Sequence, residues 1–124
     1  MHSFDPKTKQ NRSFSTASQI GTVVPKNKKE ALIALVDGVY TMNLETGQTE
    51  VFADMTADLT GCRLNDGKCD PAGRLWVGSM HWQQETGKAK LFSIQKLKEK
   101  NETIYKLYEY INQTHQIMRL CDNN

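Results

Sequence analysis

The sequence lacks several features that would assign it to large classes of protein. No apolar run among its 124 residues approaches the roughly 20 residues that a membrane-spanning helix needs. The first residues contain no apolar segment of the secretory kind. The formal net charge is only +2, which is too small to indicate binding to nucleic acid or to an anionic membrane. We therefore expect a cytoplasmic protein with neither nucleic-acid nor membrane partners.

Cysteine is also scarce. Cys62, Cys69 and Cys121 are odd in number and follow no metal-ligand spacing, so we expect reduced thiols. Hydrophobic residues make up 38% and charged residues 24% of the chain, as in an ordinary globular protein. The length limits the chain, residues 1–124, to a single domain.

What the sequence does contain is a series of short strand patterns separated by turns. Asp37-Gly38 stands between two apolar runs and predicts a two-residue hairpin. Asp70-Pro71-Ala72-Gly73 places Asp, Pro and Gly where a type I turn favours each of them. Apolar runs and β-branched residues predict strands over residues 13–24, 31–36, 39–44, 49–52, 74–80, 90–94 and 103–111.

Three segments of the chain resemble one another. Residues 2–14 match residues 40–52 without a gap, and a looser copy with a longer turn covers residues 92–104. Each copy has the pattern strand, turn, strand, and repeats of about 40 residues built from short strands are typical of β-propeller blades. The last copy also fits helical spacing, so a helix over residues 96–118 is the alternative. Its β-branched and aromatic residues favour strands.

Polar residues and turn formers are densest in residues 63–80. Arg63 and Asn65 are two positions apart, so on a strand their side chains point to the same side. A guanidinium offers five donors in a fixed fork that suits carboxylates and sugar oxygens, and an amide oxygen is a hard ligand for calcium or magnesium. The competing interpretation is that Asn65-Asp66-Gly67 only forms a hairpin turn.

Residues 63–80 carry the pattern Arg-x-Asn-Asp-Gly-Lys-x-Asp-Pro-x-Gly-Arg-x-x-x-Gly-x-Met. This pattern is similar to the signature of the SMP-30/gluconolactonase/luciferin-regenerating family, and a looser match extends from residue 4 to about residue 110. The resemblance implies an all-β fold, namely about two and a half blades of a six-bladed β-propeller, with a divergent tail over residues 112–124. It also implies hydrolysis of sugar lactones such as gluconolactone, with a divalent metal in the central channel: calcium, or else zinc, magnesium or manganese.

The resemblance also implies roles for individual residues. Arg63, Asn65 and Gln83 are expected to face the sugar lactone, and Gln83 stands where the family usually has a charged glutamate. The family's metal shell needs a glutamate, an asparagine and an aspartate that find no match here. His115 lies where the asparagine is expected, and imidazole suits calcium poorly.

We therefore expect an incomplete lactonase without full activity. The sequence does not identify its catalytic residues. The alternative is a non-enzymatic protein that binds calcium or sugar, or that associates with itself through an open sheet edge.

Overall fold

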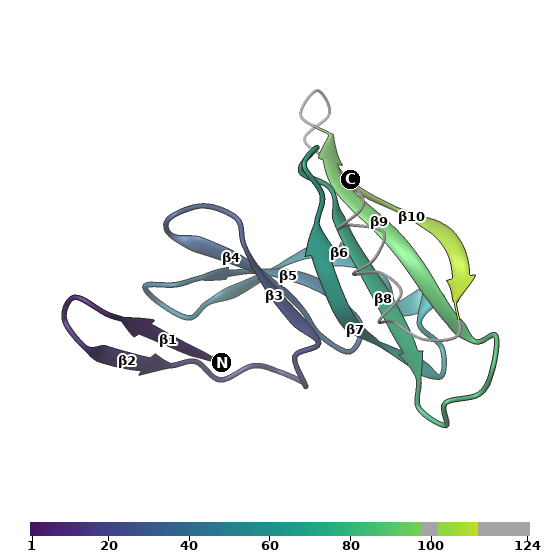
Figure 1. The fold of residues 1–124 in the computed structure, drawn as a ribbon, viewed down its shortest axis with the longest axis horizontal. Coiled ribbons are helices and arrows are strands. Elements are labelled where there is room, and N and C mark those ends of the chain that lie inside the picture. Colours follow the sequence, from purple (N-terminus) through teal and green to yellow (C-terminus); the bar gives the residue numbers. More distant parts are fainter. Residues whose placement is uncertain (98–101, 112–124) are drawn as a thin grey trace.

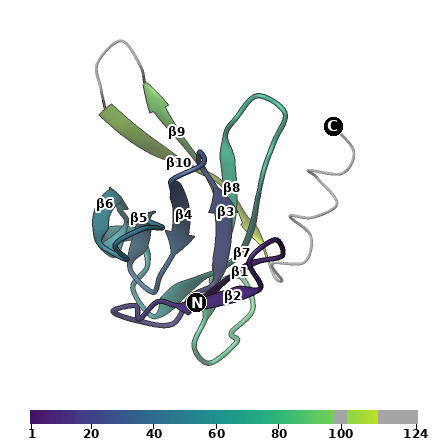
Figure 2. The same ribbon diagram turned by 90° about the vertical axis from the view of Figure 1, so that its left-hand side faces the viewer.

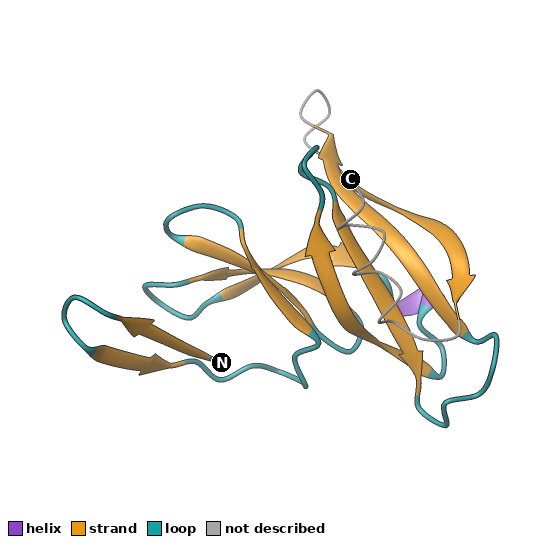
Figure 3. Cartoon of the chain, in the orientation of Figure 1, coloured by secondary structure: helices purple, strands orange, loops and turns teal. Residues whose placement is uncertain are grey.

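The computed structural model describes residues 1–97 and 102–111, which form strands and one short 3-10 helix (Figure 1, Figure 3). The 3-10 helix η1 (Thr56–Asp58) precedes β7. The strands are β1 (His2–Asp5), β2 (Gln10–Ser13), β3 (Thr22–Pro25), β4 (Glu30–Ala34), β5 (Gly38–Asn43), β6 (Thr49–Asp54), β7 (Cys62–Cys69), β8 (Leu75–His81), β9 (Ala89–Leu97) and β10 (Glu102–Ile111). The all-β prediction is confirmed.

The strands form three antiparallel sheets in which chain neighbours pair. A two-stranded sheet contains β1 and β2, and two four-stranded sheets have the orders β3-β4-β5-β6 and β10-β9-β8-β7. The two larger sheets lie against each other, with β3 of one beside β7 of the other (Figure 2). The arrangement corresponds to two complete blades and half of a preceding blade, as the family resemblance implies.

The repeat is visible in the turns of two hairpins. In the β1–β2 turn the Asp5 carboxylate accepts a hydrogen bond from the backbone N–H of Lys7 at 2.8 Å, and Lys9 has a positive φ of 60°. In the β5–β6 turn the Asn43 side chain accepts from Glu45 at 2.8 Å, and the residue with positive φ is a glycine. Equivalent residues therefore cap equivalent turns.

The C-terminal hairpin settles the choice between strand and helix for part of the chain. β10 pairs with β9 from Glu102↔Leu97 to Ile111↔Ala89, so the helical alternative is wrong for residues 102–111. Residues 96–97 are the end of β9, so the helical alternative is wrong there too. Residues 98–101 and 112–118 of the predicted helix, and the divergent tail, lie outside the described residues.

Two strand predictions are corrected. Residues 13–24 do not form one strand, because residues 14–21 cross from the β1–β2 sheet to the next one. The crossing is fixed by Phe14, which is buried, and by the Ser18 hydroxyl, which accepts from the backbone N–H of Val36 at 3.2 Å. The apolar run at 31–36 ends as a strand at Ala34, and a turn follows it.

The predicted hairpin joins the expected strands, but Gly38 is not a turn residue. It is the first residue of β5 and has no positive φ, whereas Leu35 donates its backbone N–H to the Gly38 carbonyl across the turn at 2.9 Å. A Cβ at Gly38 would collide with the carbonyl oxygen of Ala53 on β6. The glycine is therefore required by the close approach of a neighbouring strand.

The main core fills the space between the two four-stranded sheets. Its fully buried members include Val39, Met55, Leu64, Val77 and Phe92. Cys62 and Leu64 face this core from β7, and strand side chains alternate between faces, so Arg63 is directed to the opposite side. The core thus fixes the orientation of the predicted site.

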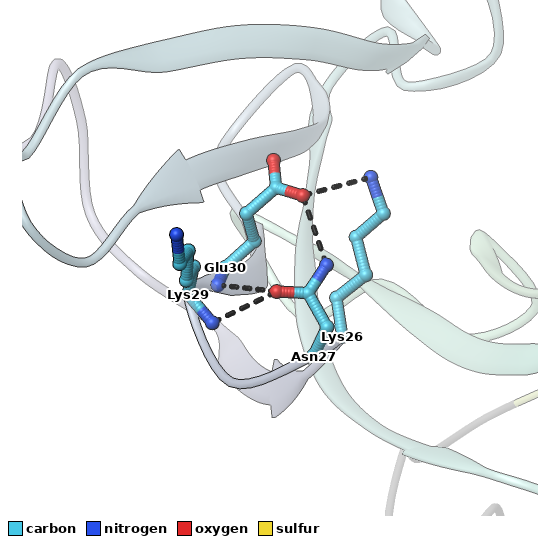
Figure 4. Close-up of polar contacts among 4 residues, drawn as sticks. All are labelled: Lys26, Asn27, Lys29 and Glu30. Atoms are coloured by element: carbon cyan, nitrogen blue, oxygen red, sulfur yellow. Dashed lines mark hydrogen bonds and ion pairs between the residues drawn. The ribbon is translucent and has the colours of Figure 1, made fainter.

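Side-chain hydrogen bonds stabilise the turns at the surface of the fold. In the β3–β4 turn the Asn27 amide oxygen accepts from the backbone N–H groups of Lys29 and Glu30 at 2.8 and 2.9 Å (Figure 4). Cys62 and Cys69 carry reduced thiols, as expected, and Cys121 lies outside the described residues. Within the described part of the chain, no helix is long and apolar enough to span a membrane.

Candidate functional site

The motif at Asn65-Asp66-Gly67 forms a bulge inside a strand, so the hairpin-turn interpretation is wrong. Leu64 pairs with Ser79 and Gly67 pairs with Val77, which leaves Asn65 and Asp66 opposite one residue of β8. The Asp66 carboxylate accepts a hydrogen bond from the backbone N–H of Gly67 at 2.8 Å and braces the bulge. Bulges bend a strand and redirect the adjacent side chains, and they are frequent next to functional sites.

The close packing around Gly67 explains why a glycine follows the bulge. A Cβ on this residue would lie 2.7 Å from the Trp76 carbonyl oxygen and 3.1 Å from the Thr22 methyl group. The Thr22 hydroxyl also donates to the Gly67 carbonyl at 3.3 Å, which joins β3 to β7. The bulge is therefore held by both its own sheet and the neighbouring sheet.

Arg63 and Asn65 converge at this point, as their spacing predicts. Arg63 Nη1 donates to Asn65 Oδ1 at 3.3 Å and to the Leu64 carbonyl at 3.2 Å. Arg63 Nη2 and Asn65 Nδ2 both lie close to the Met80 sulfur, at 3.9 and 4.0 Å. Met80 is the cross-strand partner of Arg63, so one β8 residue supports both polar side chains.

The remaining part of the guanidinium is also constrained. Its central carbon lies 5.6 Å from the centre of the Trp82 ring, within the range of a cation–π contact. Its Nε is buried and has no hydrogen-bond partner in the described part of the chain. A ligand oxygen is one group that could satisfy such a donor.

Gly21 brings a second segment against the site. A Cβ at this position would lie 2.7 Å from the Leu64 carbonyl oxygen and closer still to that of Asn65. The backbone before β3 therefore contacts the backbone that carries Asn65 directly. The site is built where β3 and β7, the facing edge strands of the two four-stranded sheets, meet.

Gln83 does not join Arg63 and Asn65. It lies beyond the end of β8, with an exposed side chain, and no hydrogen bond connects it to either residue in the described part of the structure. Its role toward a sugar lactone stays a prediction.

A divalent metal does not fit the described residues by themselves. Within residues 1–97 and 102–111, no three His, Cys, Asp or Glu side chains lie together as a metal site requires. The Asn65 amide oxygen faces the Arg63 guanidinium, and a cation next to that oxygen opposes binding of a second cation. His115 lies outside the described residues.

Asp70 has a structural role in the turn between β7 and β8. Its buried carboxylate accepts from the backbone N–H of Arg74 at 3.0 Å, from Arg74 Nε at 2.7 Å and from Trp76 Nε1 at 2.8 Å. Burial alone would raise the pKa of Asp70, but the hydrogen bonds from Trp76 and Arg74 outweigh it and hold the pKa below its usual value. The predicted turn is present, and Gly73 N–H donates to the Asp70 carbonyl at 3.0 Å.

Sequence reasoning did not find the contacts of Met80 and Trp82 with Arg63. Met80 lies on β8, and Trp82 follows just after its end. Residues two apart on a strand point to the same side, so the pairing of Met80 with Arg63 would have predicted both contacts. That pairing depends on the bulge, which the local sequence did not reveal.

The fold and the site define the class of this protein. Antiparallel sheets packed as successive blades, with polar side chains where the edge strands β3 and β7 meet, are part of a β-propeller with a candidate polar ligand site. The family model described as the SMP-30/gluconolactonase/LRE-like region matches residues 1–114. The chain belongs to this family, and the resemblance read from the motif is confirmed.

Three curated relatives match with moderate identity. YvrE of Bacillus subtilis (strain 168), provisionally named a sugar lactone lactonase, is 33% identical over 94 residues, which are 76% of this chain and 32% of YvrE. Regucalcin of Xenopus laevis is 32% identical over 77 residues, 62% of this chain and 26% of regucalcin. The 6-deoxy-6-sulfogluconolactonase of Pseudomonas putida is 26% identical over 83 residues, 67% of this chain and 28% of that enzyme.

Solved structures give the same fold. Regucalcin from Agrobacterium tumefaciens, described as a calcium-binding protein, superimposes with a TM-score of 0.73 at 25% identity, covering 90% of this chain and 36% of that one. A luciferin-regenerating enzyme has a TM-score of 0.69 at 18% identity, with 88% and 38% covered. The chain thus matches part of the regucalcin propeller, and it spans 26–32% of the length of the curated relatives.

Proposed function

We propose that this chain supplies part of the sugar-binding site of a metal-dependent sugar lactonase. Membership of the family and the two lactonases among the relatives support the reaction class. The observation that carries the proposal is the convergence of the Arg63 guanidinium and the Asn65 amide on Met80. These groups can bind the carbonyl and hydroxyl oxygens of a lactone ring.

In the proposed reaction, water attacks the lactone carbonyl carbon, the ring C–O bond breaks, and the product is a hydroxy acid. Arg63 would bind and orient the carbonyl oxygen, which becomes a carboxylate oxygen in the product. Asn65 would bind a neighbouring hydroxyl. A fork of two parallel donors matches a carboxylate better than a single ammonium does, so the site is suited to the product as well as to the substrate.

We also propose a divalent metal for the reaction, although the described residues do not form its site. Calcium is the first candidate because the Agrobacterium regucalcin is described as calcium-binding, and zinc, magnesium and manganese are the others. Since the described residues contain no cluster of three His, Cys, Asp or Glu side chains, the ligands of this metal would come from other residues of the lactonase. Gln83 is proposed as a further substrate contact.

Two other expectations stay predictions. Cytoplasmic localisation would be checked by fractionation of the native cells. Self-association through an open sheet edge would be checked by sedimentation velocity across a range of protein concentrations, where a single concentration-independent species would contradict it.

The proposal is tested by two measurements on the same protein. Hydrolysis of D-glucono-1,5-lactone is followed in a pH-stat with and without added calcium or zinc, and binding of D-gluconate is measured by calorimetry. We expect gluconate to bind and R63A to weaken its affinity about tenfold or more, because each hydrogen bond to a charged group contributes about 1.5–3 kcal/mol. N65A should weaken it less, because a neutral amide contributes about 1 kcal/mol.

Asn11→Ala is the matched control for N65A. Asn11 is exposed on β2, in a different sheet from Arg63, and its loss should leave binding unchanged. If added metal stimulates lactone hydrolysis and R63A abolishes it, the proposed lactonase activity is supported. Gluconate binding without hydrolysis would favour the non-enzymatic alternative. Absence of gluconate binding, or equal binding by R63A and the unmodified chain, would contradict the proposed site.

A further inference from the structure

Trp82 is an exposed aromatic residue beside the candidate site. Its side chain retains 47% of its surface exposed to solvent, in the loop that follows β8. Single exposed apolar residues are common in soluble proteins, so exposure alone assigns nothing to it. The second observation is its position against Arg63, with 5.6 Å between the guanidinium carbon and the ring centre.

The backbone that carries Trp82 is firmly tethered. Its N–H donates to the Gly61 carbonyl at 3.0 Å, and the N–H of Gln84 donates to the His81 carbonyl at 2.9 Å. The N–H of Glu85 donates to His81 Nδ1 at 3.3 Å, and Gln84 has a positive φ of 56°. The indole is therefore carried on a defined turn next to the site.

The indole adds an aromatic surface to the polar groups of the site. Sugars present hydroxyls at the edge of the ring and C–H groups on its faces, and binding sites match them with polar donors and an aromatic surface. Arg63 and Asn65 supply the polar part of such a surface. Trp82 lies at the same corner because Met80, two residues before it, is the cross-strand partner of Arg63.

We propose that Trp82 is a sugar-binding residue of this site: its exposed indole surface stacks on the C–H face of the lactone ring while its contact with Arg63 restrains the guanidinium. This inference rests on the proposed function and deepens it by naming a further substrate contact. It predicts that cyclic sugar derivatives bind more tightly than the open-chain product, because only a ring offers a C–H face that can stack on the indole.

The test follows the two indole N–H signals of the chain, which contains two tryptophans. D-Glucono-1,5-lactam, in which an amide replaces the hydrolysable ester, is titrated into the ¹⁵N-labelled chain, and W82F identifies the Trp82 signal by its disappearance. We expect that signal to shift and to saturate with the ligand. We also expect W82F to bind the lactam within about 3-fold of the unmodified chain, and W82L to bind it about tenfold more weakly.

Phe4→Ala is the matched control, since Phe4 is an aromatic residue with 62% exposure on the β1–β2 hairpin, and it should bind as the unmodified chain does. Loss of binding in R63A together with unchanged binding in W82L would overturn the role of Trp82 and leave the proposed function standing. Failure of the unmodified chain to bind either the lactam or D-gluconate would overturn both. If W82L does not fold, a Trp82 signal that stays unshifted at saturation in the unmodified chain overturns the inference alone.

Discussion

Replacing Asp70 by asparagine tests whether the turn after β7 is held by a buried charge. Asp70 Oδ1 accepts from the Arg74 backbone, and Oδ2 accepts from both Arg74 Nε and Trp76 Nε1. An asparagine keeps the shape but turns one of the two oxygens into an NH₂ donor. Whichever way the asparagine amide is oriented, its NH₂ group then faces either the Arg74 backbone N–H or the two side-chain donors of Arg74 and Trp76.

The size of the effect follows from these contacts. Hydrogen bonds to a charged group contribute about 1.5–3 kcal/mol each, but the Arg74 side chain is 45% exposed and can recover part of its loss in water. We expect D70N to lower the free energy of unfolding by about 2 kcal/mol, measured by urea denaturation followed by circular dichroism.

The same variant has a defined pH dependence. Because the pKa of Asp70 is lowered from 3.8 in the folded chain, its carboxylate stabilises the fold above the unfolded-state pKa. That contribution is lost as the pH falls through the folded-state pKa. The difference between the unmodified chain and D70N should therefore be constant from about pH 7 to pH 5 and shrink below about pH 4.

Asp5→Asn is the matched control, because it makes the same change of side chain at an exposed residue, the last one of β1. It should stay close to the unmodified chain in stability. If D70N loses no more stability than D5N at pH 7, or if its deficit is equally large at pH 3, the buried carboxylate does not hold the turn.

Two further predictions concern the contacts between the sheets. Gly21→Ala should lower the free energy of unfolding by about 1–3 kcal/mol, because its Cβ would press on the carbonyl oxygens of Leu64 and Asn65. An unchanged calorimetric melting temperature would contradict that close approach. Tyr105→Phe should cost about 1 kcal/mol, because its hydroxyl donates to Asp58 at 2.7 Å. That hydrogen bond, followed by burial, raises the pKa of Tyr105 to about 12. The hydroxyl should therefore contribute its full stabilisation below pH 10 and less toward pH 12. If urea titrations find the stability lost in Tyr105→Phe to be the same at pH 12 as at pH 7, this prediction is wrong.

Local chemistry in the sequence was sufficient to predict the repeating hairpins. Asp5 and Asn43 occupy equivalent positions because a short polar side chain can accept hydrogen bonds from the next turn residues. The Asp70 turn was predictable for the same reason. The β-branched residues of the last hairpin correctly favoured strand over helix for residues 102–111.

The details that failed depend on contacts between distant residues. Gly38 was assigned to a turn, but the neighbouring β6 strand is what requires a glycine there. Asn65-Asp66-Gly67 fits a hairpin turn locally, and only its pairing with β8 makes it a bulge. The approach of Trp82 to Arg63 follows from that pairing too. Register between strands is set by tertiary packing, which a local pattern does not contain.

The central claim is that Arg63 and Asn65 bind one ligand together, and a double-mutant cycle on D-gluconate affinity tests it most directly. The calorimetric Kd is measured for the unmodified chain, R63A, N65A and the double variant. Since Arg63 Nη1 lies 3.3 Å from Asn65 Oδ1, we expect the two losses of binding free energy to be non-additive, with a coupling of about 0.5–3 kcal/mol. Strictly additive losses, or single variants that bind gluconate as tightly as the unmodified chain, would contradict it.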